Sequence, residues 1–207
     1  MQAGECKFNP AAETANPRAK TSRARLTLDV FEKILKHTQY HWAKNAFLLA
    51  LLSAQRLSDI GEMKFSQVKK IDGKEYLEVI QIKTGNKVRI SLDLRLDVIG
   101  MSLRDAINQC RDHVLSPYML HHTKYAGMAK PGSKVRTKSL SNEFRDALKR
   151  TKLEWECNPP SFHEIRSLAE RLYDKEGINT QELLGHKHAS QTAEYHDARG
   201  HDWVTIG

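Results

Sequence analysis

The sequence predicts an α+β domain that is mainly helical and carries a small three-stranded antiparallel sheet. Several segments repeat apolar residues with the 3.6-residue period of a helix. Between Phe65 and Leu92 the pattern changes to short runs separated by turn residues, which is typical of hairpins. With 207 residues and 40% hydrophobic content, the chain is long enough to bury a core.

The first two helices are expected between residues 28 and 54. Thr27 belongs to a residue type that caps helix N-termini, and the helix after it should run to about His37. Residues 41–54 are apolar on nearly all sides, which predicts a helix at the centre of the core. Arg56 and Asp59 follow the end of that helix.

The sheet is predicted from two turn signals, Asp72-Gly73 and Thr84-Gly85-Asn86-Lys87. They divide residues 65–92 into three strands that antiparallel hairpins connect. Lys83 should therefore lie at the tip of the second hairpin, on an exposed loop.

Three segments follow the sheet. Residues 102–115 are predicted to be helical, residues 121–138 to form a basic loop, and Leu140–Lys152 to form a helix with Phe144 and Leu148 facing inward.

The next helix should begin after Pro159-Pro160, where Ser161 and Glu164 have the spacing of a capping box, and Gly177 should close it. His163 would lie in its first turn and Arg166 one turn later on the same face.

A further short helix is expected from about Asn179 to Gly185, with His186 just past its end. The segment that follows should form another short helix carrying Tyr195.

The charge is unevenly distributed. The formal net charge is +8, and residues 121–152 contain nine Lys or Arg against two acidic residues, which predicts a surface for a polyanion such as DNA. The candidate DNA-binding side chains are Lys124, Lys130, Lys134, Arg136, Lys138, Arg145, Arg23 and Arg25.

The composition argues against several other classes. The three cysteines are widely spaced and lack a Cys-x-x-Cys pair, so neither a disulfide framework nor a zinc site is expected, and a reducing cytoplasm is predicted. The histidines at 186, 188, 196 and 201 lack acidic or cysteine partners at metal-binding spacing, so no metal is expected. No apolar run reaches the length of about 18 residues that spans a bilayer, and membrane contact is not expected.

Six residues in chain order combine cationic groups, hydrogen-bond donors and one nucleophilic hydroxyl: Arg56, Lys83, His163, Arg166, His186 and Tyr195. This ordered set resembles the active site of the tyrosine recombinases. Over roughly residues 25–207 the surrounding sequence looks most like the catalytic domain of lambda-type phage integrases.

The resemblance implies site-specific breaking and rejoining of DNA, as in phage or prophage integration and excision. Tyr195 would attack the scissile phosphate and form a 3′-phosphotyrosine, and Lys83 would protonate the leaving 5′ oxygen. The two arginines and two histidines would stabilise the phosphate, with Asp59 holding Arg56 in place. The resemblance implies no ATP, no metal and no other cofactor.

The resemblance also implies a domain plan and partners. Residues 1–25 would be a basic interdomain linker at the end of a missing core-binding domain, and residues 26–207 the catalytic domain, with a C-terminal tail from about residue 197. The partners would be double-stranded DNA attachment sites, three further copies in a homotetramer on paired sites, a host DNA-bending protein and an excisionase. In isolation we expect a monomer, in the nucleoid of a bacterial cytoplasm.

The sequence is also compatible with other interpretations of these residues. Singly, each residue has a structural explanation, such as a solvated edge charge for Lys83 or a half-buried aromatic for Tyr195. A relaxing activity like that of type IB topoisomerases would use the same set, and a prophage remnant would bind DNA without cutting. The intact ordered set favours a cutting enzyme.

If the basic segment clamps the DNA backbone, replacing Lys134, Arg136 and Lys138 together by Ala should weaken DNA binding and flatten its salt dependence. Each lost phosphate contact should reduce the slope of log affinity against log salt by about one unit, because fewer counterions are released. Fluorescence titrations at several salt concentrations measure this slope, and an unchanged slope would mean that the segment is only solvated.

Overall fold

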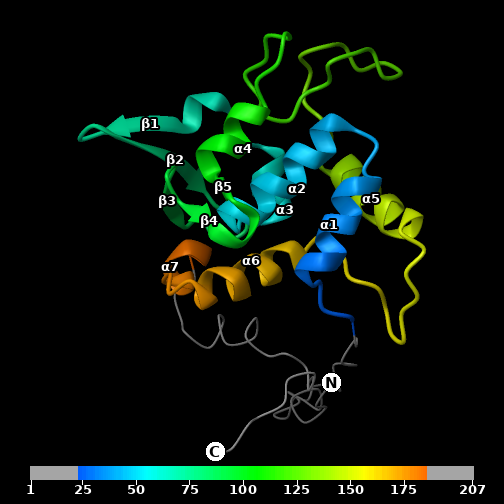
Figure 1. The fold of residues 1–207 in the computed structure, drawn as a ribbon. Helices are drawn as coiled ribbons and strands as arrows, with labels where there is room; N and C mark the ends of the chain where they lie inside the picture. The colour runs from blue at the N-terminus through cyan, green and yellow to red at the C-terminus, as the bar shows by residue number, and fades with distance from the viewer. Residues whose placement is uncertain (1–22, 186–207) are drawn as a thin grey trace, which may run out of the picture.

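The computed structural model describes residues 23–185, and helices are the main regular structure there (Figure 1). The α-helices are α1 (Leu28–His37), α2 (His41–Ser53), α3 (Leu57–Gly61), α4 (Leu103–Gln109), α5 (Thr137–Arg150), α6 (Glu164–Lys175) and α7 (Thr180–Leu184). The 3-10 helices are η2 (Phe65–Gln67) and η3 (Asp97–Ile99). The strands are β1 (Val68–Ile71), β2 (Lys74–Ile80), β3 (Lys87–Ser91), β4 (Arg95–Leu96) and β5 (Met101–Ser102).

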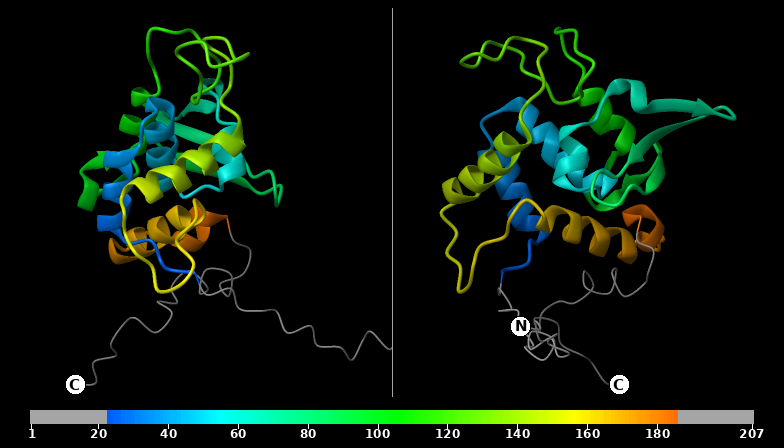
Figure 2. Two further views of the ribbon diagram at one scale, coloured as in Figure 1. Left: turned by 90° about the vertical axis from the view of Figure 1, so that its right-hand side faces the viewer. Right: turned by 180° about the vertical axis from the view of Figure 1, so that it is seen from behind.

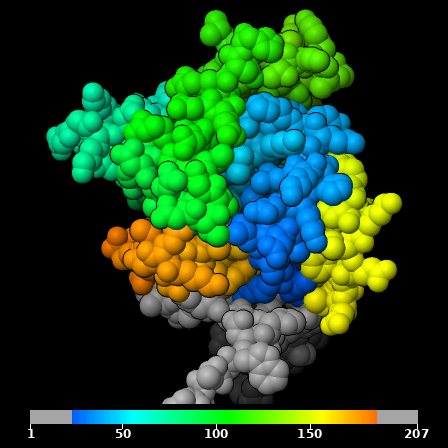
Figure 3. Space-filling view, in the orientation of Figure 1, coloured from blue at the N-terminus to red at the C-terminus, as the bar shows by residue number. Residues whose placement is uncertain are grey.

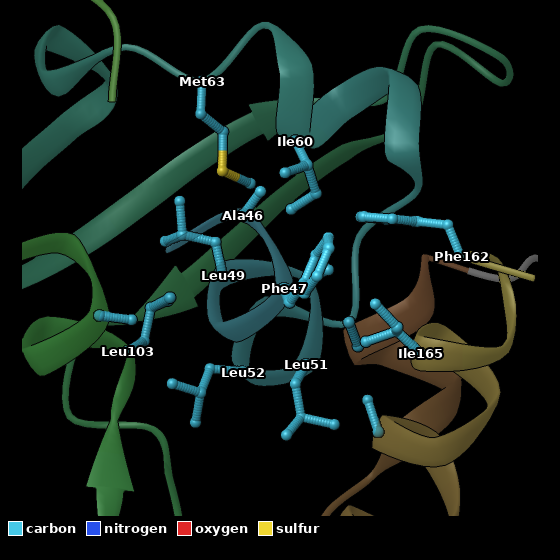
Figure 4. Packing of buried hydrophobic residues seen from close by; sticks show 14 of the residues in the cluster. Ala46, Phe47, Leu49, Leu51, Leu52, Ile60, Met63, Leu103, Phe162 and Ile165 are labelled. Carbon is cyan, nitrogen blue, oxygen red and sulfur yellow. The ribbon is translucent and has the colours of Figure 1, made fainter. Parts of the chain in front are cut away.

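The apolar helix α2 lies in the core, as predicted. Figure 4 shows its side chains pointing outward on several sides into the surrounding elements. The ring of Phe47 meets those of Phe144 on α5 and Phe162 just before α6 edge-on, with centroids 5.4 and 5.8 Å away. Helices α4, α5 and α6 all pack against α2, so three helices that follow α2 in the sequence surround it.

The first helix also matches its prediction. Thr27 is the N-cap of α1, and its side-chain oxygen accepts a hydrogen bond from the Val30 amide at 3.4 Å. Phe31 and Ile34 are buried, and α1 packs along α5. The C-terminal part of the fold also follows the sequence, since α7 begins after Asn179 and ends at Gly185.

The predicted three-stranded antiparallel sheet is present in the order β1-β2-β3. The first hairpin turns at Asp72 and Gly73, which both have positive φ (49° and 81°), the backbone state that an Asp-Gly turn favours. Figure 2 shows this hairpin projecting from the helical body. Along β2 the side chains of Leu77 and Val79 face the core.

The helix after the sheet is shorter than predicted. It ends at Gln109, although the sequence pattern predicts helix to residue 115. The Asp112 carboxylate accepts hydrogen bonds from the Val114 amide at 2.8 Å and from His121 Nε2 at 3.1 Å. This side chain offers the backbone a local turn in place of another helical turn, and the long loop up to α5 begins there.

The prediction that Ser161 and Glu164 form a capping box at the start of α6 is wrong. The N-cap is His163, and no side chain caps the helix there. The Glu164 carboxylate is buried and lies 3.5 Å from Arg25, so it does not turn back to the helix start. The amides of residues 164–166 bond instead to the carbonyls three residues earlier. The first amides of α6 are therefore bonded to the backbone rather than to a side chain.

Helix α6 and the short strands lie against each other on the face shown in Figure 3, where the orange and green segments meet. The Asp97 amide at the start of η3 donates to the Glu176 carboxylate at 3.0 Å. Several predictions fall outside the described residues: the linker up to residue 22, His186, Tyr195 and the C-terminal tail.

The contact between α3 and α5 leads to a stability prediction. A Cβ at Gly61 would lie 2.5 Å from Thr137 Oγ1, so Gly61→Ala should force the two helices apart and destabilise the protein by about 1–3 kcal/mol. Denaturant unfolding measures the loss. Combining it with Thr137→Ala should restore most of it, because the clashing hydroxyl is removed; a double variant as unstable as Gly61→Ala would contradict the explanation.

Candidate active site

The site is assembled where the end of α2, the second hairpin, the start of α6 and the end of α7 meet. Each segment contributes one of the predicted cationic groups or supports one. The sequence separations are large, since hydrogen bonds join residues 54 and 166 and residues 81 and 184. Tertiary packing therefore creates this site.

Arg56 lies at the sharp junction between α2 and α3. Ala54 ends α2 in the left-handed conformation, with φ of 53°, and Arg56 is the N-cap of α3. This turn points the half-buried Arg56 side chain toward the second hairpin, where its Nη1 donates to Gln81 Oε1 at 2.9 Å.

Asp59 does not hold the Arg56 side chain in place, contrary to the prediction from the sequence. In the described part of the chain no hydrogen bond or ion pair joins the two side chains; Asp59 Oδ1 accepts the Ile82 amide at 2.9 Å. Asp59 is almost fully buried and fixes the backbone next to Lys83. Asp59 therefore bonds to the backbone of the second hairpin, and Gln81 of the same hairpin holds the Arg56 guanidinium.

Lys83 lies in the turn between β2 and β3, as predicted. The Gly85 amide closes the turn on the Gln81 carbonyl at 2.7 Å. The Lys83 side chain is exposed. The turn is thus anchored on both sides while the ammonium group stays free to meet a ligand.

The Arg166 guanidinium is buried and held in place by hydrogen bonds to the backbone. Only 1% of it is exposed, and its Nη1 and Nη2 donate to the carbonyls of Ala54 at 2.5 Å and Leu184 at 2.7 Å. These carbonyls end α2 and α7, respectively. The guanidinium therefore joins three helices, and two of its bonds go to uncharged oxygens that leave its positive charge in place.

His163 lies at the start of α6, close to the other cationic groups. Part of its surface is exposed, yet the protein atoms around the ring lower its pKa, and the charges of Arg166, Arg56 and Lys83 lower it further. The same charges indicate that all four predicted residues gather at one place. A neutral imidazole among three cations suits a group that accepts a proton beside a bound anion.

The end of α7 places the chain just before His186. Asn179 caps the start of α7, and Gly185 ends it with φ of 65°. The final carbonyls are satisfied by side chains: Gln55 Nε2 binds the Leu183 carbonyl at 3.0 Å, and Asn86 Nδ2 binds that of Gly185 at 2.7 Å. His186 itself and Tyr195 lie outside the described residues, so their roles stay predictions.

Sequence reasoning missed three amide side chains that hold this site together, namely Gln55, Gln81 and Asn86. One signal existed for Gln81. Leu77 and Val79 face the core along β2, and Gln81, directly after the strand, continues this alternation as a polar residue that breaks an otherwise apolar face. A buried amide must find partners, so such a break marks a hydrogen-bonded network.

The candidate DNA-binding residues divide into two groups. Most are exposed, namely Lys124, Lys130, Arg136, Lys138 and Arg145. Of these five, Arg145 lies 3.5 Å from Asp146, and the other three candidates also contact the protein itself. Lys134 pairs with Glu62 at 2.5 Å, Arg23 donates to the Pro159 carbonyl at 3.1 Å, and Arg25 donates to Ser167 Oγ at 2.8 Å.

Within residues 23–185 no group of three or more His, Cys, Asp or Glu side chains is arranged to hold a metal ion. None of the helices there is both long and apolar enough to cross a bilayer.

Comparisons with known proteins agree on one family. The model described as "Phage integrase family" matches residues 24–201. The prophage integrase IntE of Escherichia coli K12 is 44% identical over 202 residues, which cover 96% of this chain and 53% of that protein. The integrase of Escherichia phage lambda is 33% identical, over 98% of this chain and 55% of that protein. The chain spans about half the length of these curated relatives.

Solved structures give the same result. A lambda integrase dimer bound to a COC′ core site superimposes with a TM-score of 0.84 at 34% identity, over 99% of this chain and 56% of that one. A lambda integrase tetramer bound to a Holliday junction gives a TM-score of 0.83 at 33% identity, over 97% and 55% of the two chains.

The lowered pKa of His163 leads to a prediction for stability. The unfolded chain binds a proton at the ordinary histidine pKa of about 6.5, before the folded protein does, so stability should fall as the pH drops below that value. Thermal unfolding from about pH 8 to about pH 5 measures this dependence. His163→Gln should reduce it but not abolish it, because burial also lowers the pKa of His122. An identical pH profile in the variant would contradict the assignment.

Proposed function

Because the chain belongs to the phage integrase family, we propose that it is the catalytic part of a site-specific recombinase that breaks and rejoins DNA through a phosphotyrosine. The observation that carries the proposal is the convergence of Arg56, Lys83, His163 and Arg166 from three separate segments, the α2–α3 junction, the second hairpin and the start of α6. Such a group of cations and donors suits a phosphodiester whose negative charge increases in the transition state.

The proposed reaction begins with attack of the Tyr195 hydroxyl on the scissile phosphorus. The tyrosine loses its proton, the phosphorus–O5′ bond breaks, and a 3′-phosphotyrosine and a free 5′ hydroxyl result. Attack by the 5′ hydroxyl of a partner strand reverses the step and releases Tyr195. Each ester bond broken is replaced by another, so the exchange needs no ATP.

The other residues have distinct roles in the proposal. Arg56 and Arg166, with His186, stabilise the non-bridging oxygens. The exposed Lys83 gives a proton to the leaving 5′ oxygen. His163 is suited to receive the tyrosine proton, because its lowered pKa keeps the imidazole neutral near neutral pH.

The partners are proposed by analogy with the relatives. Lambda integrase is a dimer on a core site in one structure and a tetramer on a Holliday junction in another. We propose that this chain likewise acts on double-stranded attachment sites and forms a tetramer when two sites are paired. A host bending protein and an excisionase would control direction, and the reaction would take place on DNA in a bacterial nucleoid.

The experiment that tests the function uses a nicked duplex whose cleaved end diffuses away and traps the covalent complex. The parent chain should become attached to the 3′ end, and Tyr195→Phe should abolish attachment while leaving DNA affinity within about a few-fold, because the hydroxyl acts in chemistry more than in binding. A chain that binds but never attaches would instead be a DNA-binding module. Relaxation of a plasmid without recombination sites would indicate a topoisomerase.

The two arginines should differ when replaced by Ala. Arg56→Ala should slow covalent attachment by roughly 10²-fold or more, since a donor to the transition state is lost. Arg166→Ala should do the same and also destabilise the fold by about 1–3 kcal/mol, because the buried Ala54 carbonyl loses its donor and the Leu184 carbonyl keeps only Gln81. Trapping rates and thermal unfolding measure the two effects. Equal stability of both variants would contradict the structural role of Arg166.

A further inference from the structure

Gln81 uses all four hydrogen-bonding positions of its side-chain amide beside the site, and it lies outside the six residues predicted to act on DNA. We propose that Gln81 is a positioning residue that fixes Arg56 and the Lys83 turn to the end of α7. The inference rests on the function proposed above for the role of Arg56, although the positioning itself can be measured without DNA.

The first support is the hydrogen-bond set of the Gln81 amide. Its Nε2 donates to Gln55 Oε1 at 2.8 Å and to the Leu184 carbonyl at 2.9 Å. Its Oε1 accepts from Arg56 Nη1 at 2.9 Å and from Thr84 Oγ1 at 2.8 Å. Two donors and two acceptors are the full capacity of an amide side chain. No part of it remains for solvent, and its exposed fraction is 0%.

The second support is that these partners allow one orientation. A guanidinium can only donate, so the atom facing Arg56 must be the amide oxygen; a backbone carbonyl can only accept, so the atom facing Leu184 must be the nitrogen. A rotated amide would lose both bonds. Gln55 cannot relieve this by rotating, since its own nitrogen binds the carbonyls of Ser53 and Leu183 at 3.0 Å.

The third support is close packing at the end of α7. A Cβ at Gly185 would lie 2.9 Å from Gln81 Nε2 and 2.9 Å from a methyl group of Val88. Glycine thus serves two needs at this position, the left-handed backbone that ends the helix and the space for the Gln81 amide. The end of α7 and the amide therefore fix each other.

The network links the two arginines of the site. Arg56 binds Gln81, Gln81 binds the Leu184 carbonyl, and that carbonyl also accepts from Arg166. A shift at the end of α7, from which the chain continues toward Tyr195, would therefore reach Arg56. Because the Gln81 amide is neutral, it orients the Arg56 guanidinium without cancelling the charge that a phosphate needs, as a carboxylate partner would.

A double-mutant cycle on the full chain tests the proposal. Gln81→Met keeps an unbranched side chain of similar length but removes all four bonds. It should slow covalent trapping by about 10²-fold in the parent chain, because a misplaced donor is lost to the reaction. In the Arg56→Ala background the same change should cost less than about three-fold, since the group it positions is already gone. Equal losses in both backgrounds would mean a general effect on structure and would overturn the proposal.

Gln67→Met is the matched control. Gln67 also makes two hydrogen bonds, from its Nε2 to the Glu78 carbonyl at 3.2 Å and from the Lys64 amide to its Oε1 at 2.7 Å, but it contacts neither arginine. This variant should trap DNA at the parent rate. Thermal unfolding checks that each variant folds. If Gln81→Met does not fold, Gln81→Asn carries the same cycle, because it keeps a polar amide in the buried site but is one methylene too short to bond Arg56 and the Leu184 carbonyl together.

NMR of the Arg56 guanidinium supplies a readout that needs no cleavage. In the free parent chain the bond to Gln81 should slow rotation of this group and give separate Nη signals, which Arg56→Ala identifies by their absence. Gln81→Met should merge them and Gln67→Met should not. If the signals change as expected but the parent chain never attaches to DNA, the proposed function fails and the positioning stands. Unchanged signals in Gln81→Met would overturn the positioning while cleavage by the parent chain still supported the function.

Discussion

The site depends on one requirement, that the last carbonyl groups of α7 find hydrogen-bond donors. A helix leaves its final carbonyls without partners inside the helix, and a buried carbonyl without a donor is costly. In α7 the carbonyls of residues 183–185 are bound by the side chains of Gln55, Gln81, Arg166 and Asn86. These four side chains come from three segments that lie apart in the sequence. The hydrogen bonds that they donate to the end of one short helix therefore bring the parts of the site together.

The same requirement explains how a cationic site stays cationic in a folded protein. Burying a guanidinium is expensive unless its donors are used. Arg166 uses two of its donors on the carbonyls at the ends of α2 and α7, and Arg56 uses one on the Gln81 amide. The buried carboxylate of Asp59 is directed to the backbone at Ile82. These neutral contacts hold the arginines in position while preserving the attraction for a phosphate.

Much of the fold could be predicted from the sequence, because the deciding signals are local. The cap at Thr27, the Asp72-Gly73 turn and the apolar α2 each specify one element from a few neighbouring residues, and the structure confirms all three. The predictions that failed involve side chains that bond to partners outside the pattern from which they were predicted. Glu164 lies beside Arg25 instead of capping α6, and Asp112 binds His121 in a loop where the pattern predicted helix.

The sequence by itself determined which residue types stand in which order: the apolar helix, the three strands, the lysine in its turn, and the set of cations that resembles a recombinase site. The sequence shows these residue types and their order directly, because neither depends on how far apart the residues lie in the fold or on which way their side chains point. Only the tertiary structure decided which side chain forms a hydrogen bond to each arginine of the site. It placed Gln81 rather than Asp59 against Arg56 and buried Arg166 between two helix ends. The reason is that hydrogen bonds between segments some 25 to 112 residues apart are set by how α2 packs against its neighbours, and no local pattern in the chain records that packing.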